Sequence, residues 1–231
     1  MTAATIDLNA DLGEGMANEA ALMALVSSCN IACGGHAGDA TSMRAALTLA
    51  KQYGVAAGAH PSYPDREGFG RRTLDLPASA LTAALAAQVA ALKQEADGLD
   101  VTLTHYKPHG ALYNSAARDA TLAALIAESC ADTLPGARLV GPPGSALQKA
   151  AAEAGLTYIA EGFADRAYND GGALVARSEP GAVLEDDTAR TAQALALATG
   201  QPVTTASGQT LRLPVQTICL HGDSPGALAS A

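Results

Sequence analysis

Residues 101–114 read VTLTHYKPHGALYN, a short apolar run that leads into a histidine, a lysine, a second histidine and a glycine. On a β-strand, side chains two residues apart point to the same face, so His105 and Lys107 are expected to lie side by side. Similar short apolar runs recur along the chain and alternate with longer segments of helical periodicity. This alternation is typical of βα units, so the sequence predicts an α/β fold with a parallel sheet.

Seven strands and six intervening helices follow from this pattern. The expected strands are Thr5–Leu8, Cys29–Ala32, Val55–Ala59, Val101–Tyr106, Arg138–Val140, Leu156–Ala160 and Gln216–Leu220. The expected helices are Ala20–Ser27, Ser42–Gln52, Ala78–Ala96, Asp119–Ala131, Ser145–Ala154 and Asp187–Thr199. The segment 202–213, with Gly208 at its centre, predicts an inserted surface hairpin. No linker or repeat interrupts the pattern, so residues 1–231 are expected to form a single (β/α) barrel domain.

Ionisable and amide side chains follow six of the predicted strands. In a barrel, the carboxyl ends of the parallel strands meet on the face that carries the active site, whereas a doubly wound sheet gathers such residues from two or three strands. We therefore predict a (β/α)7-type TIM-like barrel, whose wall could be irregular or incompletely closed. The residues expected on that face are Asn9, Asp11, Glu14, Asn30, His36, His60, Lys107, His109, Glu161, Arg166, His221 and Asp223.

The composition narrows the class of protein further. The chain has 231 residues with 14 Lys and Arg against 23 Asp and Glu, a net charge of −9 that disfavours nucleic acid as a partner. No apolar run is long enough for a membrane span, and the first residues lack a secretory signal pattern, so we expect a cytoplasmic protein. The four cysteines show no CxxC pair, which predicts reduced, buried thiols.

Carboxylates and histidines in the first third of the chain suggest acid–base or metal chemistry. Asp7, Asp11 and Glu14 lie close together in sequence, so one of them would hold a raised pKa or they would share a metal. His36 and His60 each follow a strand in a glycine-rich turn and, with Asp11 or Glu14, could form a His/His/carboxylate site for a divalent metal. The competing interpretation is that the carboxylates cap a helix and the histidines are hydrogen-bonded structural residues.

Cationic side chains suggest how an anionic substrate would be held. The segment 65–72 reads DREGFGRR, a polar loop with glycine hinges whose Arg71 and Arg72 could bind a carboxylate or phosphate. Surface ion pairs within the loop are the alternative. Lys107 inside a barrel requires a carboxylate partner, for which Asp11 and Glu161 are available, or a substrate anion. It could stabilise a developing oxyanion, or merely form a buried structural salt bridge.

Six motifs together resemble the LamB/YcsF family, whose members are also called the A component of 5-oxoprolinase. They are DLNADLGEG, NIACGGHAGD, GAHPSYPDREGFGRR, HYKPHGALYN, EGFADRAY and ICLHGD, in order from Ile6 to Asp223. The resemblance implies a barrel related to those of glycoside hydrolases and polysaccharide deacetylases. It also implies ATP-dependent opening of the 5-oxo-L-proline lactam to L-glutamate, together with two partner subunits, B and C. Gly35 and Tyr106 depart from the family pattern, where Phe and Val are usual, at positions that would shape the pocket wall.

The residues then take the following expected roles. Asp11 or Glu161 would be the general base, with Lys107 and His109 facing the oxyanion, and His36, His60 and Glu14 available as metal ligands. ATP is expected to be handled mainly by the partners, because the chain lacks a G-x-x-x-x-G-K-[ST] loop. Two alternatives remain: a stand-alone metal-dependent amidase or deacetylase, and a non-catalytic substrate-binding subunit. The residues expected to bind substrate are Asn9, Arg71, Arg72, Asn114, Arg166, His221 and Asp223.

Overall fold

Seven parallel strands close a barrel in the computed structural model, which describes residues 5–222 and 227–230. Six strands lie in chain order around the wall, and β9 completes it by pairing with both β6 and β1. The predicted TIM-like barrel is therefore confirmed, and its wall is closed. The barrel strands are β1 (Asp7–Leu12), β2 (Ser28–Ala32), β3 (Ala56–His60), β4 (Leu103–Tyr106), β5 (Arg138–Gly141), β6 (Tyr158–Phe163) and β9 (Thr217–Cys219).

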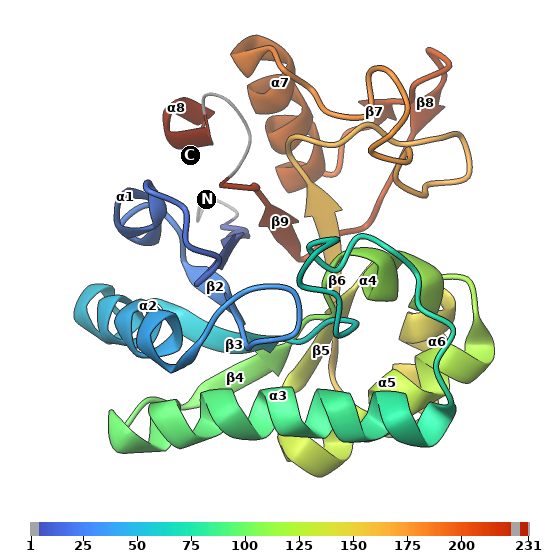
Figure 1. Ribbon diagram of the computed structural model, residues 1–231. Coiled ribbons are helices and arrows are strands. Elements are labelled where there is room, and N and C mark those ends of the chain that lie inside the picture. The colour runs from blue at the N-terminus through green and yellow to red at the C-terminus, as the bar shows by residue number, and fades with distance from the viewer. Residues whose placement is uncertain (1–4, 223–226, 231) are drawn as a thin grey trace.

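Helices cover the outside of the barrel, as Figure 1 shows. Side chains at their N-termini fix several starting points: Asp39 forms a capping box with Ser42, and Ser145 accepts a hydrogen bond from the Gln148 N–H. None of the helices in the described part of the chain is both long and apolar enough to cross a membrane. The helices are α1 (Glu19–Met23), α2 (Ala40–Tyr53), α3 (Ala78–Gly98), α4 (Gly110–Ala116), α5 (Ala120–Thr133), α6 (Ala146–Glu153), α7 (Asp187–Ala198) and α8 (Ala227–Ser230).

Strand β1 is longer than predicted, and the difference moves two polar residues into the barrel. We expected the strand to end at Leu8, with Asn9 and Asp11 in the following turn, but it continues to Leu12. Ala10 and Leu12 pack in the apolar core, whereas Asn9 and Asp11 form hydrogen bonds inside the barrel. The alternation of polar and apolar residues is that of a strand whose inner face is polar.

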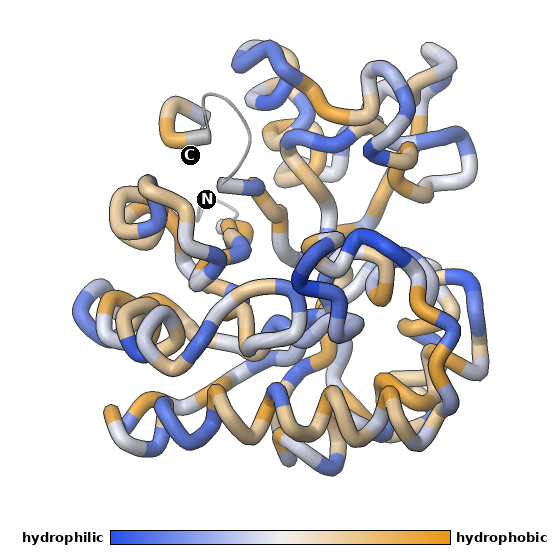
Figure 2. Tube along the Cα trace, viewed as in Figure 1, coloured by the Kyte–Doolittle hydropathy of each residue, from blue (hydrophilic) through white to orange (hydrophobic). Residues whose placement is uncertain are grey.

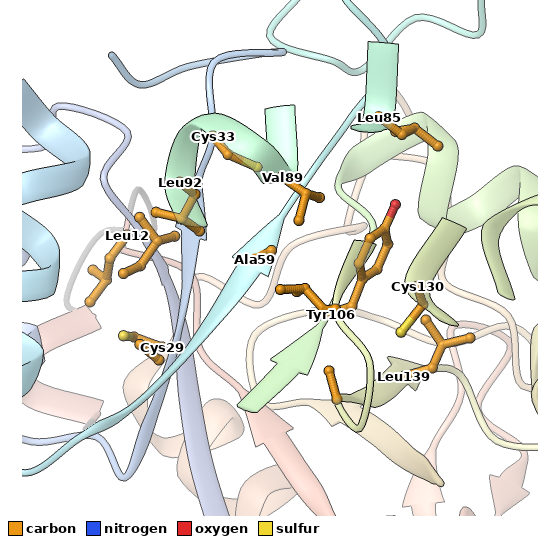
Figure 3. Packing of buried hydrophobic residues seen from close by; sticks show 14 of the residues in the cluster. Leu12, Cys29, Cys33, Ala59, Leu85, Val89, Leu92, Tyr106, Cys130 and Leu139 are labelled. Carbon is orange, nitrogen blue, oxygen red and sulfur yellow. The ribbon is translucent and has the colours of Figure 1, made fainter. Parts of the chain in front are cut away.

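The apolar core lies between the strands and the helices and consists mainly of small and medium side chains. Figure 3 shows Cys29, Cys130 and Leu139 among these residues, together with Tyr106, whose hydroxyl group lies 3.1 Å from Ser129 Oγ. All four cysteines are free and buried, as predicted. The alanine-rich helices can therefore approach the strands closely while the barrel interior is kept for polar groups.

Two irregular segments lie outside the regular βα pattern. Strands β7 (Val203–Thr204) and β8 (Thr210–Leu211) form an antiparallel pair within 202–213, and Gly208 in their connection has φ +85°. The connection from β6 to α7 is long and is tied together by the isolated bridges Arg166–Val183 and Tyr168–Leu174. The 65–72 loop crosses the barrel mouth as the hydrophilic arch of Figure 2. This loop and the β6–α7 connection contribute walls to the site.

Candidate active site

A cavity of about 690 Å³ opens at the carboxyl ends of the barrel strands. Its floor is formed by residues of β1, β6 and the turn after β4, and its walls by the 65–72 loop and the β6–α7 connection. The barrel thus brings together the residues that the sequence placed after separate strands. Those that line the cavity are Asp11, Glu14, His60, Arg71, Lys107, His109, Asn114, Glu161, Arg166 and His221.

Lys107 lies on the cavity floor between two carboxylates. Its Nζ is 2.9 Å from Asp11 Oδ1 and 2.8 Å from Glu161 Oε1, and all three side chains are almost fully buried. Burial lowers the pKa of Lys107, but the charges of Asp11 and Glu161 outweigh this effect and raise the pKa well above its ordinary value. Burial raises the pKa of Asp11, whereas His60 and Lys107 lower it, with a net result well below the ordinary value. The floor therefore carries a fixed ammonium–carboxylate centre.

One carboxylate oxygen of this centre is available to a ligand. Asp11 uses Oδ1 for Lys107 and Asn30, and its Oδ2 lies 3.3 Å from His60 Nε2. Glu161 Oε2 and the buried hydroxyl group of Tyr113, in contrast, form no hydrogen bond of normal geometry in the described part of the chain. The two groups are neighbours, because burial and the Glu161 carboxylate together raise the pKa of Tyr113. Both residues line the cavity. Buried polar atoms without partners are costly, so these two atoms are suited to receive a polar ligand or water.

A column of amides and an imidazole supports the floor from inside the barrel. Asn9 Nδ2 donates to Glu161 Oε1, and Asn30 Nδ2 donates to both Asn9 Oδ1 and Asp11 Oδ1. His105 Nε2 lies 2.9 Å from Asn30 Oδ1. Asn9, which we expected to bind substrate, does not line the cavity but lies beneath it. Its contacts orient the carboxylates rather than reach into the cavity.

Acid should weaken the fold through His105. Burial lowers the pKa of His105 from 6.5 to about 4, so the folded protein holds the neutral imidazole. Stability from this group is complete above pH 6.5 and is lost as the pH falls towards 4, because the unfolded chain then binds the extra proton. We expect His105 to account for roughly 3 kcal/mol of the loss in unfolding free energy between pH 7 and pH 4. Urea unfolding of the wild type and of His105→Gln at both pH values measures this loss. An equal loss of unfolding free energy in the two proteins would contradict the role of His105.

Three imidazoles and a carboxylate meet beside the floor. His36, His60, His109 and Glu14 each offer a ligand atom, and these atoms lie within 4.8 Å of one another. His36 and His109 stack with ring centroids 3.6 Å apart, and His36 Nε2 is 3.0 Å from Glu14 Oε1. Burial is the main cause that lowers the pKa of both His36 and His109. His109, predicted to face the oxyanion, therefore belongs to the cluster that the sequence suggested for His36, His60 and Glu14.

The hydrogen bonds of His60 and His109 leave two lone pairs facing each other. His60 Nδ1 lies 2.8 Å from the Lys107 carbonyl oxygen, and His109 Nε2 lies 2.9 Å from that of Phe69. A carbonyl oxygen only accepts, so these two nitrogens carry the protons, and in neutral rings the other nitrogens are acceptors. Those acceptors, His60 Nε2 and His109 Nδ1, are 2.9 Å apart. A cation between the rings, or a proton held in the pair, is needed to reconcile them.

The two arginines of the 65–72 loop have different environments. Arg71 lines the cavity, with its Cζ 5.0 Å from the centre of the Phe69 ring. Arg72, which we expected to bind substrate, is not among the residues that line the cavity and instead pairs with Asp65 through both Nε and Nη2. This pairing lowers the pKa of Asp65. Arg72 therefore forms the ion pair that was the alternative for this loop, whereas Arg71 lies on the cavity wall and its anion binding stays a prediction.

The remaining predicted substrate contacts lie on the walls, apart from one. Asn114 donates to the Gly110 carbonyl within α4, and His221 Nδ1 lies 3.0 Å from the buried Asp165. Arg166 is buried, and its Nε and Nη2 donate to the carbonyl groups of residues 182 and 175. Asp223 lies outside the described residues.

Two wall residues escaped the sequence analysis. Arg118 follows α4 and Arg177 lies in the β6–α7 connection, and both line the cavity. Neither stands at a strand end or in a glycine-rich turn, the two sequence patterns that indicate a site residue in a barrel. Their presence in the same cavity depends on how the long connections fold back over the barrel, and no local pattern indicates this.

Comparison with known proteins agrees with this architecture. A crystal structure from Thermus thermophilus, described as a lactam utilization protein, has a TM-score of 0.91 and 37% sequence identity over 98% of this chain and 94% of its own. The pattern of the LamB/YcsF family matches residues 6–231, which include every described residue of the cavity. The chain therefore belongs to the LamB/YcsF family.

Proposed function

We propose that this protein is one component of a cytoplasmic, ATP-dependent 5-oxoprolinase that opens the lactam of 5-oxo-L-proline to L-glutamate with two partner subunits, B and C. The Lys107 centre on the floor of the cavity is the observation that carries this proposal. Family membership and the lactam utilization protein from Thermus thermophilus support a lactam as substrate. ATP-dependent glutamate formation by the three purified components tests the proposal, and formation that is unchanged without this chain would refute it.

Hydrolysis of a lactam requires a base for water and positive charge near the carbonyl oxygen. Glu161 is suited to act as the base because its Oε2 forms no hydrogen bond of normal geometry in the described part of the chain, whereas both oxygens of Asp11 have neighbours. Lys107 supplies a fixed positive charge 2.8 Å from Glu161, which stabilises negative charge that develops on the carbonyl oxygen. Arg71 on the wall is suited to pair with the substrate carboxylate.

The imidazole cluster fits a divalent metal ion, which we include in the proposal. The facing lone pairs of His60 and His109, with Glu14 nearby and His36 hydrogen-bonded to it, form the nitrogen-rich donor set that Zn²⁺ and related transition metals prefer. When bound, such an ion polarises a carbonyl oxygen as a Lewis acid. The residues that would hold it are His36, His60, His109 and Glu14.

Metal content should depend on these imidazoles and not on the others. We expect purified protein to bind about one Zn²⁺ per chain, since the four donor atoms converge on one point. His60→Ala removes one of the two facing lone pairs and should weaken binding by at least about tenfold. His221 belongs to a second group that could hold a metal ion, together with Asp11 and Cys219, so His221→Ala tells the two groups apart and should retain the metal if the imidazole cluster is the site. Elemental analysis and zinc titration measure both variants. Zinc binding that survives in His60→Ala, or is lost equally in His221→Ala, would rule out this site.

The same cluster favours one alternative function. A stand-alone metal-dependent amidase would use the metal and Asp11 to hydrolyse a lactam or acetamide without ATP. Such an enzyme would release product with this chain alone and would stop when a chelator is added. Activity that requires ATP and the partner subunits supports the first proposal instead.

A further inference from the structure

The lactam reaction proposed above needs a proton donor as well as a base. When water adds to the carbonyl carbon and the carbon–nitrogen bond breaks, the ring nitrogen leaves with the electron pair of that bond and must take up a proton. A positioned donor typically raises the rate of such a step by roughly 10²–10⁴-fold. Glu161 and Lys107 serve the water and the carbonyl oxygen, so another side chain is needed at the nitrogen.

The N–H groups around the floor are already directed at other acceptors. Lys107 Nζ lies 2.9 and 2.8 Å from the two floor carboxylates and 3.2 Å from Cys219 Sγ. His60 and His109 each direct one ring N–H at a backbone carbonyl group. His221 Nδ1 lies 3.0 Å from a buried carboxylate, which holds the proton of the neutral ring at that nitrogen. These groups are poorly placed to donate to the nitrogen of a ligand.

Tyr113 on α4 places a hydroxyl group beside the Lys107 centre. The side chain lines the cavity and is buried. Its ring packs edge-on against Phe163 with the ring centroids 5.8 Å apart, and Lys107 Nζ lies 5.4 Å from the centroid of the same Phe163 ring. The Tyr113 hydroxyl group and its neighbour Glu161 Oε2 both form no hydrogen bond of normal geometry in the described part of the chain. A ligand at this point of the cavity can therefore contact both groups.

The hydroxyl group of Tyr113 differs from those of two other tyrosines near Glu161. Tyr158 donates to the Pro142 carbonyl at 2.9 Å, and the Tyr168 oxygen accepts from a backbone N–H at 2.6 Å. Burial and the Glu161 carboxylate raise the pKa of Tyr113 well above its ordinary value, so the phenol keeps its proton at neutral pH. It can still give that proton to the nitrogen of a breaking carbon–nitrogen bond, because that nitrogen is more basic than a phenolate.

We propose that Tyr113 is the catalytic proton donor to the ring nitrogen of the lactam. This inference rests on the proposed function, because it assigns a step of the ring opening. Glu161 Oε2 takes a proton from water as the water oxygen bonds to the carbonyl carbon. The carbon–nitrogen bond then breaks, its electron pair goes to the nitrogen, and the nitrogen takes the hydroxyl proton of Tyr113. The proton on Glu161 passes to the phenolate, so both side chains return to their starting states.

Tyr113→Phe in the assay with all three components tests this role. We expect kcat for glutamate formation to fall roughly 10²-fold while KM for 5-oxo-L-proline stays within about twofold, because the nitrogen accepts a proton only as its bond to carbon breaks. The midpoint of urea unfolding should equal or exceed that of the wild type, because the variant loses a buried hydroxyl group that forms no hydrogen bond of normal geometry. A variant that is as stable as the wild type but slow is the signature of a catalytic hydroxyl group.

Tyr158→Phe is the matched control, with the opposite expected result. Its hydroxyl group is hydrogen-bonded and Tyr158 does not line the cavity, so the variant should unfold at lower urea and keep the wild-type kcat. An unchanged kcat in Tyr113→Phe, a rise in KM alone, or an equal fall of kcat in Tyr158→Phe would overturn the role of Tyr113 and leave the proposed function standing. If the three wild-type components form no glutamate, the proposed function fails and the role of Tyr113 fails with it.

Discussion

Replacing Lys107 with methionine is expected to reduce the rate of glutamate formation by roughly 10²–10³-fold, the usual cost of removing one group that stabilises an oxyanion. The side chain keeps its length and apolar stem, so the loss would come from the ammonium group. That group is the cation between Asp11 and Glu161, both of which are buried. Without it, one carboxyl group should take up a proton, which also weakens Glu161 as a base.

The matched control is Lys149→Met, the same change at an exposed position on α6. It should leave the rate unchanged. Circular dichroism and urea unfolding report whether Lys107→Met is folded under the assay conditions, since removal of one partner from a buried ion pair typically costs about 3–5 kcal/mol. A folded Lys107→Met protein with the wild-type rate would show that the centre is structural.

Gly58→Ala is expected to destabilise the protein by about 3 kcal/mol, because overpacking and a broken buried hydrogen bond each cost about 1–3 kcal/mol. A Cβ atom at Gly58 would lie 2.2 Å from Cδ2 of the His105 ring. The ring cannot move away without loss of its contacts with Asn30 and Thr104, at 2.9 and 3.0 Å. Displacement of His105 would therefore also disturb the amide column beneath the carboxylates.

Gly98→Ala provides the control for this change. An added Cβ atom there meets no atom within 4 Å, and alanine favours the helical backbone at the end of α3. We expect its unfolding free energy to equal or slightly exceed that of the wild type. Urea unfolding of the two variants makes the comparison, and equal stability would contradict the tight packing of His105 against β3.

The fold can be predicted from the sequence because the alternation of short apolar runs and helical segments is local and repeats along the chain. Polar residues follow six of the seven predicted strands, and a barrel brings that many strand ends to one face, whereas a doubly wound sheet gathers them from two or three strands. The error at β1 has the same physical origin as the site. The polar Asn9 and Asp11 predict a turn after Leu8, but a barrel with a polar interior accepts both side chains on a strand.

The sequence predicts less well which site residues lie next to one another, because this depends on the paths of the loops. Asp11, Lys107 and Glu161 were correctly expected as neighbours, since they occupy strands or strand ends of one barrel. His109 lies beside His36 and His60 because its backbone N–H donates to the Pro61 carbonyl, which draws the start of α4 towards β3. Nothing in the spacing of the HYKPHG motif indicates this contact.

The ratio of glutamate formed to ATP hydrolysed tests most directly whether this chain is a component of an ATP-dependent 5-oxoprolinase. This chain, the two partner subunits, ATP and 5-oxo-L-proline would be combined, and each component would be omitted in turn. The account predicts that glutamate and ADP form together, that both stop when ATP or any protein component is left out, and that Glu161→Gln stops glutamate release. Glutamate release by this chain alone without ATP, or an unchanged yield when this chain is omitted, would contradict it.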